Sequence, residues 1–282
     1  MKAFISVDLE GMPHVITPGH LWLKGSLYDE ARKIATKVTL AVVEKLHENG
    51  FDEILIADSH GPMVNLLVED LPEYVEIIRG SPRPASMVAG VEECDAALFL
   101  GYHAKAGTAK SAFDHTYSGR SIHQLEINGE PASEFLLNAY TAGEFNVPVI
   151  LVAGDAQLLE DDVKKHAPWV ETVILKRSLT RIAARSRSMV SIEKDLKEKV
   201  RKAVSNFKAN ETKLLVTEKP VKTLVSFKES LFADAAELLP IIKRIDGLNV
   251  EYTASNMVEA YKIFQLLVIA ASGLSSYLTA LQ

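Results

Sequence analysis

The feature that most constrains the fold is a set of short apolar runs in which polarity does not alternate. These runs occupy residues 3–8, 53–58, 96–103, 147–155 and 170–177. A strand that is apolar at successive positions is buried on both faces, because neighbouring side chains point to opposite sides of a sheet. Helical patterns at 28–50 and 132–145 lie between these runs, as in a parallel sheet with helical connections. The sequence therefore predicts an α/β fold, a mostly parallel sheet with helices on both faces.

The second half of the chain follows a different pattern. A charged amphipathic helix is expected at 188–207, and strand, helix, strand and helix follow over 222–272. This order predicts a smaller α+β domain at the C-terminus. The basic, serine-rich segment KRSLTRIAARSRS interrupts the pattern between the two halves. We therefore expect two domains, residues 1–178 and residues 179–282.

Three shorter elements complete the expected order. Residues 75–80 and 122–129 are predicted to be strands, and residues 65–71 a short helix. Near the C-terminus, the apolar stretch at 261–278 contains Lys262, Gln265 and several serines, which favours a buried helix over a membrane span.

Charge and leader sequence narrow the possible partners and the compartment. The chain carries 31 Lys and Arg against 37 Asp and Glu, and no basic block stands out. This balance argues against nucleic acid and anionic membrane as partners. The apolar segment AFISV is too short for the hydrophobic region of a signal peptide. We expect a cytoplasmic protein.

The cysteine count limits how a metal could be bound. The chain has one cysteine, Cys94, so an intrachain disulfide and a cysteine-based zinc site are both excluded. Any metal must be held by histidine and carboxylate groups.

Polar side chains occur where several of the predicted strands end. They are Asp8 and Glu10 after the first strand, Asp58, Ser59 and His60 after the second, His103 after the strand at 96–103, and Asp155 after the strand at 147–155. In open parallel sheets the carboxyl ends of the strands meet at one edge, where ligands bind. Histidine nitrogen and carboxylate oxygen are suitable zinc ligands. Their combination predicts a metal site at this edge.

Each of these positions also has a simpler explanation. Asp58 or Ser59 can cap a helix, and His103 can be a buried histidine in a glycine-rich turn. For Asp155 we favour the capping role. The metal hypothesis depends on the conjunction of three strands that deliver acids or histidines to the same edge.

Two further segments can contribute to such a site. Glu134 and Asn138 are four residues apart in the helix predicted at 132–145, so they share one face, which could equally point to solvent. His115 lies in a loop rich in glycine, serine and threonine downstream of His103. A loop histidine near a metal can serve as general base, proton shuttle or nucleophile. His123 is expected to be structural or to lie at an interface.

The chain also resembles a known family, the zinc-dependent D-aminopeptidases of the bacterial DppA type. The resemblance is densest over the first 155 residues and continues in order to the C-terminal helix. The segments that carry it are SVDLEG, ADSHGPMVNL, RPASMVAG, LFLGYHAKAGT, DHTYSG, ASEFLLNAYTAGEFNVPVILVAGD and MVEAYKIF.

The resemblance implies a hydrolase with a specific site. It implies a metallopeptidase with two zinc ions per chain and five ligands, Asp8, Glu10, His60, His103 and Glu134. Asp8 would bridge the two ions, and His115 would be the catalytic nucleophile or acid/base. Asp58 and Asn138 are candidates to orient these ligands from behind.

The resemblance also implies substrates and an assembly. The substrates would be short peptides or amides with an N-terminal D-amino acid, admitted to an internal channel of a homodecamer. The loop after Glu10 and the segment at 178–199 differ from the family pattern, and loops set specificity. The preference for D- or L-residues and the metal used in the cell therefore stay open.

Three alternatives remain beside this hypothesis. Another metal-dependent amide or ester hydrolase, such as an L-aminopeptidase or deacylase, would share the ligand set. A non-catalytic peptide-binding protein could keep the metal for structure, although structural zinc sites usually have four protein ligands. A nucleotide-binding domain is disfavoured, because no glycine-rich phosphate-binding motif follows any predicted strand.

Overall fold

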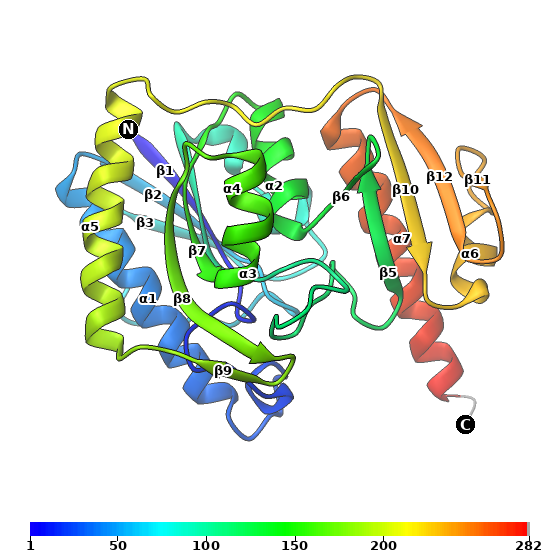
Figure 1. Ribbon diagram of the computed structural model, residues 1–282, viewed down its shortest axis with the longest axis horizontal. Coiled ribbons are helices and arrows are strands. Elements are labelled where there is room, and N and C mark those ends of the chain that lie inside the picture. The colour runs from blue at the N-terminus through cyan, green and yellow to red at the C-terminus, as the bar shows by residue number, and fades with distance from the viewer. Residues whose placement is uncertain (281–282) are drawn as a thin grey trace.

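The computed structural model describes residues 1–280, and its larger sheet has the strand order β3-β2-β1-β4-β7-β8-β9 (Figure 1). These strands are β1 (Lys2–Val7), β2 (Glu53–Asp58), β3 (Val75–Ile78), β4 (Ala96–Tyr102), β7 (Val149–Asp155), β8 (Glu171–Thr180) and β9 (Ala183–Arg185). All neighbours pair in parallel except β8 and β9, which are antiparallel. The predicted parallel sheet is confirmed.

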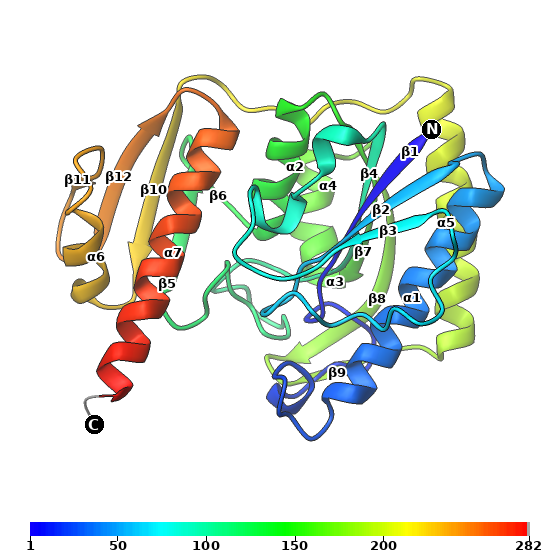
Figure 2. The same ribbon diagram turned by 180° about the vertical axis from the view of Figure 1, so that it is seen from behind.

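Helices cover both faces of the large sheet, as the apolar strands require (Figures 1 and 2). On one face lie α1 (Tyr28–Glu48) and α5 (Met189–Lys208). On the other lie α2 (Glu134–Glu144) and a helical segment made of α3 (Ala156–Leu158), η4 (Leu159–Val163) and α4 (Lys164–His166). Successive β1 residues divide between the two cores: Phe4 packs on the α2 side, and Ile5 on the α1 side.

The small sheet is antiparallel and has the order β11-β12-β10-β5-β6. Its strands are β5 (Ile122–Ile127), β6 (Glu130–Pro131), β10 (Val221–Phe227), β11 (Lys243–Arg244) and β12 (Asn249–Ala254). The helices α6 (Ser230–Ala236) and α7 (Met257–Ala280) pack on it, and α7 also contacts α2. Short 3₁₀ turns are η1 (Pro18–His20), η2 (Ser86–Val88) and η3 (Val91–Glu93). The predicted α+β part is thus present.

The two sheets do not divide the chain at the expected boundary after residue 178. The helix α5 follows that boundary, yet it packs on α1 and on strands β7 and β8 of the large sheet. The strands β5 and β6 precede it, yet they belong to the small sheet. The chain forms two strands of the small sheet before it completes the large sheet. The composition of local segments does not predict this order.

The short helix predicted at 65–71 is wrong. This segment is a loop, because the carboxylate of Asp58 competes with helical hydrogen bonding. Asp58 accepts hydrogen bonds from the Leu66 amide at 2.8 Å and from Asn65 Nδ2 at 2.6 Å. Asn65 Nδ2 also donates to the carbonyl of His60 at 2.7 Å.

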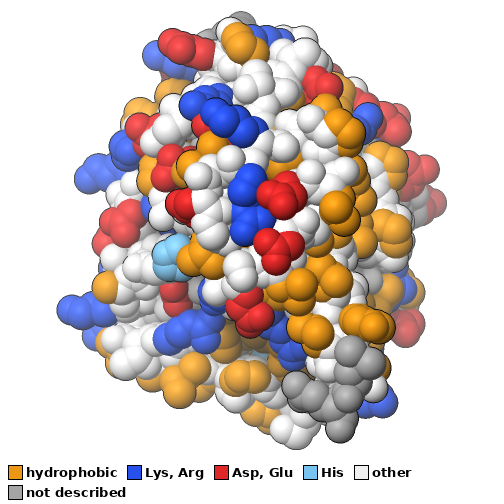
Figure 3. Space-filling model, turned by 90° about the vertical axis from the view of Figure 1, so that its right-hand side faces the viewer, with side chains coloured by type: hydrophobic (Ala, Val, Ile, Leu, Met, Phe, Trp, Pro, Cys, Tyr) orange, Lys and Arg blue, Asp and Glu red, His pale blue; other side chains and the backbone are white. Residues whose placement is uncertain are grey.

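The C-terminal helix α7 is buried over only part of its surface. Tyr261 and Phe264 are fully packed, whereas Ile269 and Tyr277 are 47% and 61% exposed. The expectation of a buried helix is therefore wrong for the outer face and the second half. By length and composition, α7 is the one helix of the described chain that could cross a membrane. Within its apolar 18-residue segment, 17% is buried. Figure 3 shows hydrophobic side chains gathered beside the C-terminal end.

Two glycines allow β1 and β4 to run on into closely packed loops. A Cβ on Gly11 would lie 2.0 Å from the carbonyl oxygen of Tyr102, and one on Gly101 would lie 2.0 Å from that of Asp8. Gly101 also has φ +75°, in the left-handed region that favours glycine. This close approach brings the segments that carry Asp8 and His103 together, and Gly11 lies within the turn that the hydrogen bond from the Met12 amide to the Leu9 carbonyl closes.

Candidate metal centre

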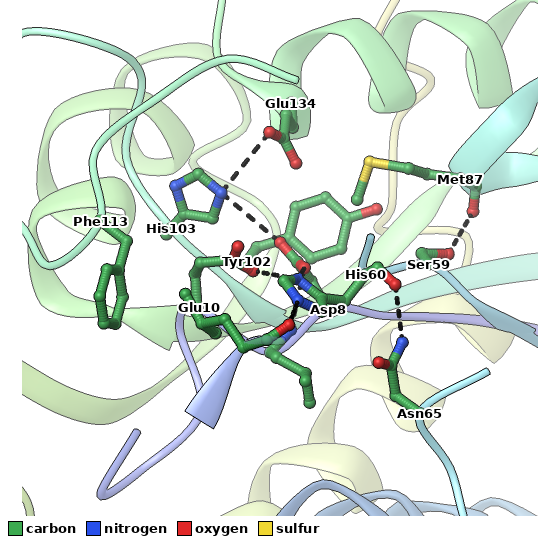
Figure 4. Close-up of polar contacts among 12 residues, drawn as sticks. Asp8, Glu10, Ser59, His60, Asn65, Met87, Tyr102, His103, Phe113 and Glu134 are labelled. Atoms are coloured by element: carbon green, nitrogen blue, oxygen red, sulfur yellow. Dashed lines mark hydrogen bonds and ion pairs between the residues drawn. The ribbon is translucent and has the colours of Figure 1, made fainter. Parts of the chain in front are cut away.

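The predicted site residues meet at the carboxyl edge of three adjacent strands. Because β1 lies between β2 and β4, Asp8 and Glu10 lie between His60 and His103 (Figure 4). Glu134 enters from the first turn of α2, which Ser133 caps by accepting the Leu136 amide. The parallel arrangement thus brings the strand-end residues to one place, as expected from the sequence.

The first half of the cluster joins His60 to two carboxylates. His60 Nδ1 lies 2.7 Å from Glu10 Oε2 and 3.4 Å from Asp8 Oδ1. All three residues are buried, with 7%, 4% and 2% of their surface exposed, respectively. A histidine that faces two buried carboxylates is suited to share a cation with them.

The second half of the cluster is built around His103 and Glu134. His103 Nε2 lies 3.6 Å from Asp8 Oδ2 and 3.5 Å from Glu134 Oε1. His115 Nε2 lies 3.6 Å from the same Glu134 oxygen, and its ring stacks on His103 with centroids 4.4 Å apart. Asp8 therefore faces both halves of the cluster.

A main-chain carbonyl lies against the other ring nitrogen of each histidine. The pairs are His60 Nε2 with Leu21 at 2.9 Å, His103 Nδ1 with Ala104 at 3.0 Å, and His115 Nδ1 with Phe113 at 2.6 Å. A carbonyl can only accept, so it holds a proton on that nitrogen, and the facing nitrogen offers its lone pair whenever the ring is neutral, as it must be to bind a metal. Metal-binding histidines are held in this way.

Two buried atoms at the centre of the cluster lack any hydrogen-bond partner among the described residues. They are a carboxylate oxygen, Asp8 Oδ2, and a ring nitrogen, His103 Nε2, which face each other 3.6 Å apart (Figure 4). Leaving such groups unpaired is costly. The residues fit a metal ion, which would pair both atoms. Two sets of ligand atoms lie within 4.8 Å of one another: Asp8, Glu10 and His103, and His103, His115 and Glu134.

The pKa values of Asp8 and Glu10 are shifted by burial and by neighbouring charges. Burial, together with the charge of Glu10, raises the pKa of Asp8 well above its ordinary value. Burial would also raise the pKa of Glu10, but the charge and hydrogen bond of His60 outweigh it and hold that pKa well below. A bound cation would favour the charged form of both carboxylates.

The pKa values of His103 and His115 are shifted in opposite directions by burial and by neighbouring charges. Burial would lower the pKa of His103, but the negative charges of Glu134 and Asp8 raise it to about 10 in the metal-free chain. The pKa of His115 is lowered by burial and by the neighbouring His103. His115 is also the more open of the two, with 18% of its side chain exposed against 1%. It is therefore the histidine best placed to meet a substrate as a neutral base.

The two residues predicted to support the ligands hold positions behind the cluster. Asp58 binds Asn65, which in turn holds the carbonyl of His60, so its effect on His60 is indirect. Asn138 bonds no predicted ligand among the residues described; it bonds the hydroxyls of Tyr102 at 2.9 Å and Tyr261 at 2.7 Å. Asp155 caps the next helix through the Gln157 amide, in agreement with the simpler explanation.

Several residues near the site were not singled out from the sequence. The carbonyls of Leu21 and Phe113 carry no sequence signal, because any residue supplies one. Asn65 was placed in a helix that does not form. Lys176 had a recognisable signal, since it is a single lysine at the end of the apolar run VETVIL, and it is 1% exposed.

Such a sheet, with buried histidines and carboxylates on adjacent strand ends and an accessible histidine beside them, is the kind of arrangement that metal-dependent hydrolases of the α/β class use. The comparison with known families is specific. The model of the D-aminopeptidase family, Peptidase M55, matches residues 1–266. The chain belongs to this family, and it is a peptidase enzyme.

Individual relatives agree over nearly the whole chain. A D-aminopeptidase of Bacillus subtilis (strain 168) is 33% identical over 264 residues, which cover 93% of this chain and 94% of the relative. The solved structure of the Zn-dependent D-aminopeptidase DppA from Bacillus subtilis, described as a self-compartmentalizing protease, superimposes with a TM-score of 0.91. It is 31% identical, and the match covers 96% of this chain and 98% of that one. The predicted resemblance and fold class are confirmed.

Proposed function

We propose that this protein hydrolyses short peptides or amides with an N-terminal D-amino acid, through a site that holds two zinc ions. The observation that carries the proposal is the pair of buried atoms Asp8 Oδ2 and His103 Nε2, which lie 3.6 Å apart without a hydrogen-bond partner among the described residues. Membership of the D-aminopeptidase family and the zinc dependence of the DppA relative support the substrate class and the metal.

The other four predicted ligands lie on two sides of Asp8. Glu10 and His60 lie on one side of its carboxylate, and His103 and Glu134 lie on the other. Asp8 would bridge the two ions. When bound, zinc supplies a Lewis acid for the scissile carbonyl and lowers the pKa of a coordinated water towards neutrality.

His115 provides the proton transfer in this proposal. Its Nδ1 is held by the Phe113 carbonyl, so its Nε2 is available to the reacting groups. Nε2 accepts a proton from the attacking water and returns it to the departing amine, which keeps the proton count balanced over the reaction. Direct attack by Nε2 is the alternative role, and it would form an acyl-imidazole that water must then cleave.

We also propose that the chain works as a homo-oligomer that restricts access to short peptides. The support is the self-compartmentalizing character of the DppA relative and the exposed apolar side chains of this chain, among them Ile269 on α7. A decamer is the size that the family resemblance implies. Sedimentation of the purified protein measures this size directly.

A substrate panel with controlled metal content tests the proposal. Paired D- and L-alanyl amides, D-Ala-containing dipeptides and an ester are assayed with protein of measured zinc content, before and after chelation. We expect about two zinc ions per chain, hydrolysis of the D-aminoacyl substrates, loss of activity on chelation, and recovery when zinc is restored.

Other results would contradict it in distinguishable ways. A protein that takes up no zinc would remove the metal site from the mechanism. Zinc-dependent turnover of only the L-amides or the ester would assign the site to another metal-dependent hydrolase. Full zinc occupancy without turnover of any substrate would favour a binding protein.

A further inference from the structure

A buried lysine lies directly behind the candidate metal centre. Lys176, near the middle of β8, is 1% exposed, and its ammonium donates hydrogen bonds to the carbonyls of Glu10 and of Val15, the latter at 2.6 Å. No carboxylate of residues 1–280 forms an ion pair with it within 4.0 Å. A lysine is rarely buried in this way, because removing an ammonium from water is costly. Its carbonyl partners therefore require an explanation.

The same ammonium also contacts the segment that carries His115. It lies 5.6 Å from the centroid of the Phe113 ring, within the range of a cation–π interaction. The carbonyl of Phe113 is the group that accepts the hydrogen bond from His115 Nδ1. One side chain thus touches both the main chain of a predicted ligand and the residue that holds the catalytic histidine.

The segment around Phe113 needs such support. Phe113 has φ +54°, a left-handed conformation that is unfavourable for a residue with a side chain. The preceding Ala112 amide is held by Ser178 Oγ at 2.9 Å and by Asp155 Oδ2 at 3.2 Å. The ends of β7 and β8 therefore fix the main chain before Phe113, and Lys176 packs against its ring.

We propose that Lys176 is a positioning residue that fixes Glu10 and His115 relative to each other. Its hydrogen bonds hold the segment from Glu10 to Val15 in place, and its contact with Phe113 sets the direction of the His115 ring. The proposal rests on the proposed metal site for its functional meaning, but the contacts themselves involve only this chain.

The test replaces Lys176 with methionine, which keeps the length of the side chain and removes its charge and its donors. Zinc affinity is measured by competition with a chromogenic chelator. Histidine ring signals of the zinc-free protein are measured by NMR after selective labelling. We expect Lys176→Met to weaken zinc binding by about 10- to 100-fold, as is typical when a residue behind a metal ligand is lost. The ring signals of His60 and His115 should shift, while that of the distant His47 stays in place.

Leu196→Ala is the matched control for lost stability. Leu196 is a fully buried residue of α5 in the core under the large sheet, with no polar contact to the site. This variant should lower the melting temperature and leave zinc affinity and the His60 and His115 signals unchanged. A second variant, Phe113→Leu, keeps the carbonyl and removes the ring, so it should shift the His115 signal and leave the His60 signal in place.

The outcomes separate this proposal from the proposed function. If Lys176→Met binds zinc like the parent, or loses no more affinity than Leu196→Ala, the positioning role is refuted. If Lys176→Met does not fold, an unchanged His115 signal in Phe113→Leu refutes the coupling. A parent protein that binds no zinc contradicts the proposed function, and the ring signals of the zinc-free protein still decide the role of Lys176.

Discussion

At the scale of single residues, Asp8 is the carboxylate that joins the two halves of the site. Its two carboxylate oxygens face different histidines, His60 at 3.4 Å and His103 at 3.6 Å. Burial raises its pKa in the metal-free chain, and a bound cation would favour its charged form instead. Asp8 Oδ2 has no hydrogen-bond partner among the described residues, so a bound cation would supply the partner that this oxygen lacks.

Replacing Asp8 with asparagine should abolish the binding of both metal ions. The amide keeps the shape of the side chain but has no negative charge, and one of its two terminal atoms cannot accept a metal bond. Elemental analysis of the purified variant measures the effect. Glu171→Gln is the matched control, since Glu171 is a buried carboxylate of the same sheet, at the start of β8. Two retained zinc ions and full activity in Asp8→Asn would contradict the proposed bridge.

His115→Ala should lower kcat by about 10²- to 10⁴-fold, the usual contribution of a general acid or base. The zinc content should stay at the parental value, because the five ligands remain. His123→Ala is the control, as His123 is an exposed residue on β5. Steady-state kinetics with a D-aminoacyl amide and elemental analysis provide the measurements. A large loss of zinc in His115→Ala would instead make His115 a ligand beside His103 and Glu134.

At the scale of secondary-structure elements, the contact between α5 and β8 shows that α5 belongs with the large sheet, although it follows the boundary predicted after residue 178. Glu171 at the start of β8 pairs with Lys199 and Lys202 of α5, both at 2.7 Å. The apolar face of α5, which includes Leu196 and Val200, packs on the same side of the large sheet as α1. The helix thus belongs to the large sheet by both its charges and its core.

The Glu171 pairs should make the stability of this contact depend on pH. Burial would raise the pKa of Glu171, but hydrogen bonds to Lys199 and Lys202 outweigh it and hold the pKa below 4.5. A carboxyl whose pKa is lowered in the folded state stabilises the fold at pH values above its ordinary pKa. This stabilisation disappears as the pH falls through the pKa of the folded state. Glu171→Gln should therefore lower the free energy of unfolding at pH 7 by about 0.5–1 kcal/mol, since the pair is partly exposed.

The difference between parent and Glu171→Gln should shrink from pH 7 to an acidic pH below the lowered pKa that Glu171 has in the folded protein, because its carboxyl is then neutral. Urea denaturation of the zinc-free protein at the two pH values measures it. An equal difference at both pH values would show that the side chain acts by packing and not by its charge.

At the scale of the whole molecule, a chain of buried hydrogen bonds joins the two sheets behind the site. Tyr261 of α7 donates to Asn138 Oδ1 at 2.7 Å, and Asn138 Nδ2 donates to the Tyr102 hydroxyl at 2.9 Å. Tyr102 donates in turn to Ser6 of β1 at 2.8 Å. Asn138 therefore links α7 to the strands that carry Asp8 and His103, a role that differs from the predicted support of a ligand.

Tyr261→Phe should lower the free energy of unfolding by about 1–3 kcal/mol, because it leaves the buried Asn138 Oδ1 without a donor. Tyr277→Phe on the same helix is the control. Its ring is 61% exposed, so the change should stay within about 0.5 kcal/mol. Chemical denaturation measures both. Equal values for the two variants would show that the link between the sheets contributes little.

The sequence by itself determined the parallel sheet and the place of the site. The apolar runs at 53–58 and 96–103 admit only strands buried on both faces, and local chain direction then puts His60 and His103 at the same edge as Asp8. These features follow from side-chain pattern and strand direction, which are local properties. The helix and loop patterns left the roles of Glu134 and His115 open, the family resemblance implied a definite role for each, and the structure brings both into contact with the cluster.

Only the tertiary structure decided which groups hold these residues. Asn138 bonds Tyr102 and Tyr261 because α7 packs against α2. The loop at 65–71 is a more local case, since Asp58 at the end of the preceding strand bonds Asn65 and Leu66. Lys176 meets Glu10 across 166 positions of sequence. Such contacts depend on how distant segments pack, and burial makes an unpaired polar group so costly that its partner is chosen by the assembled fold.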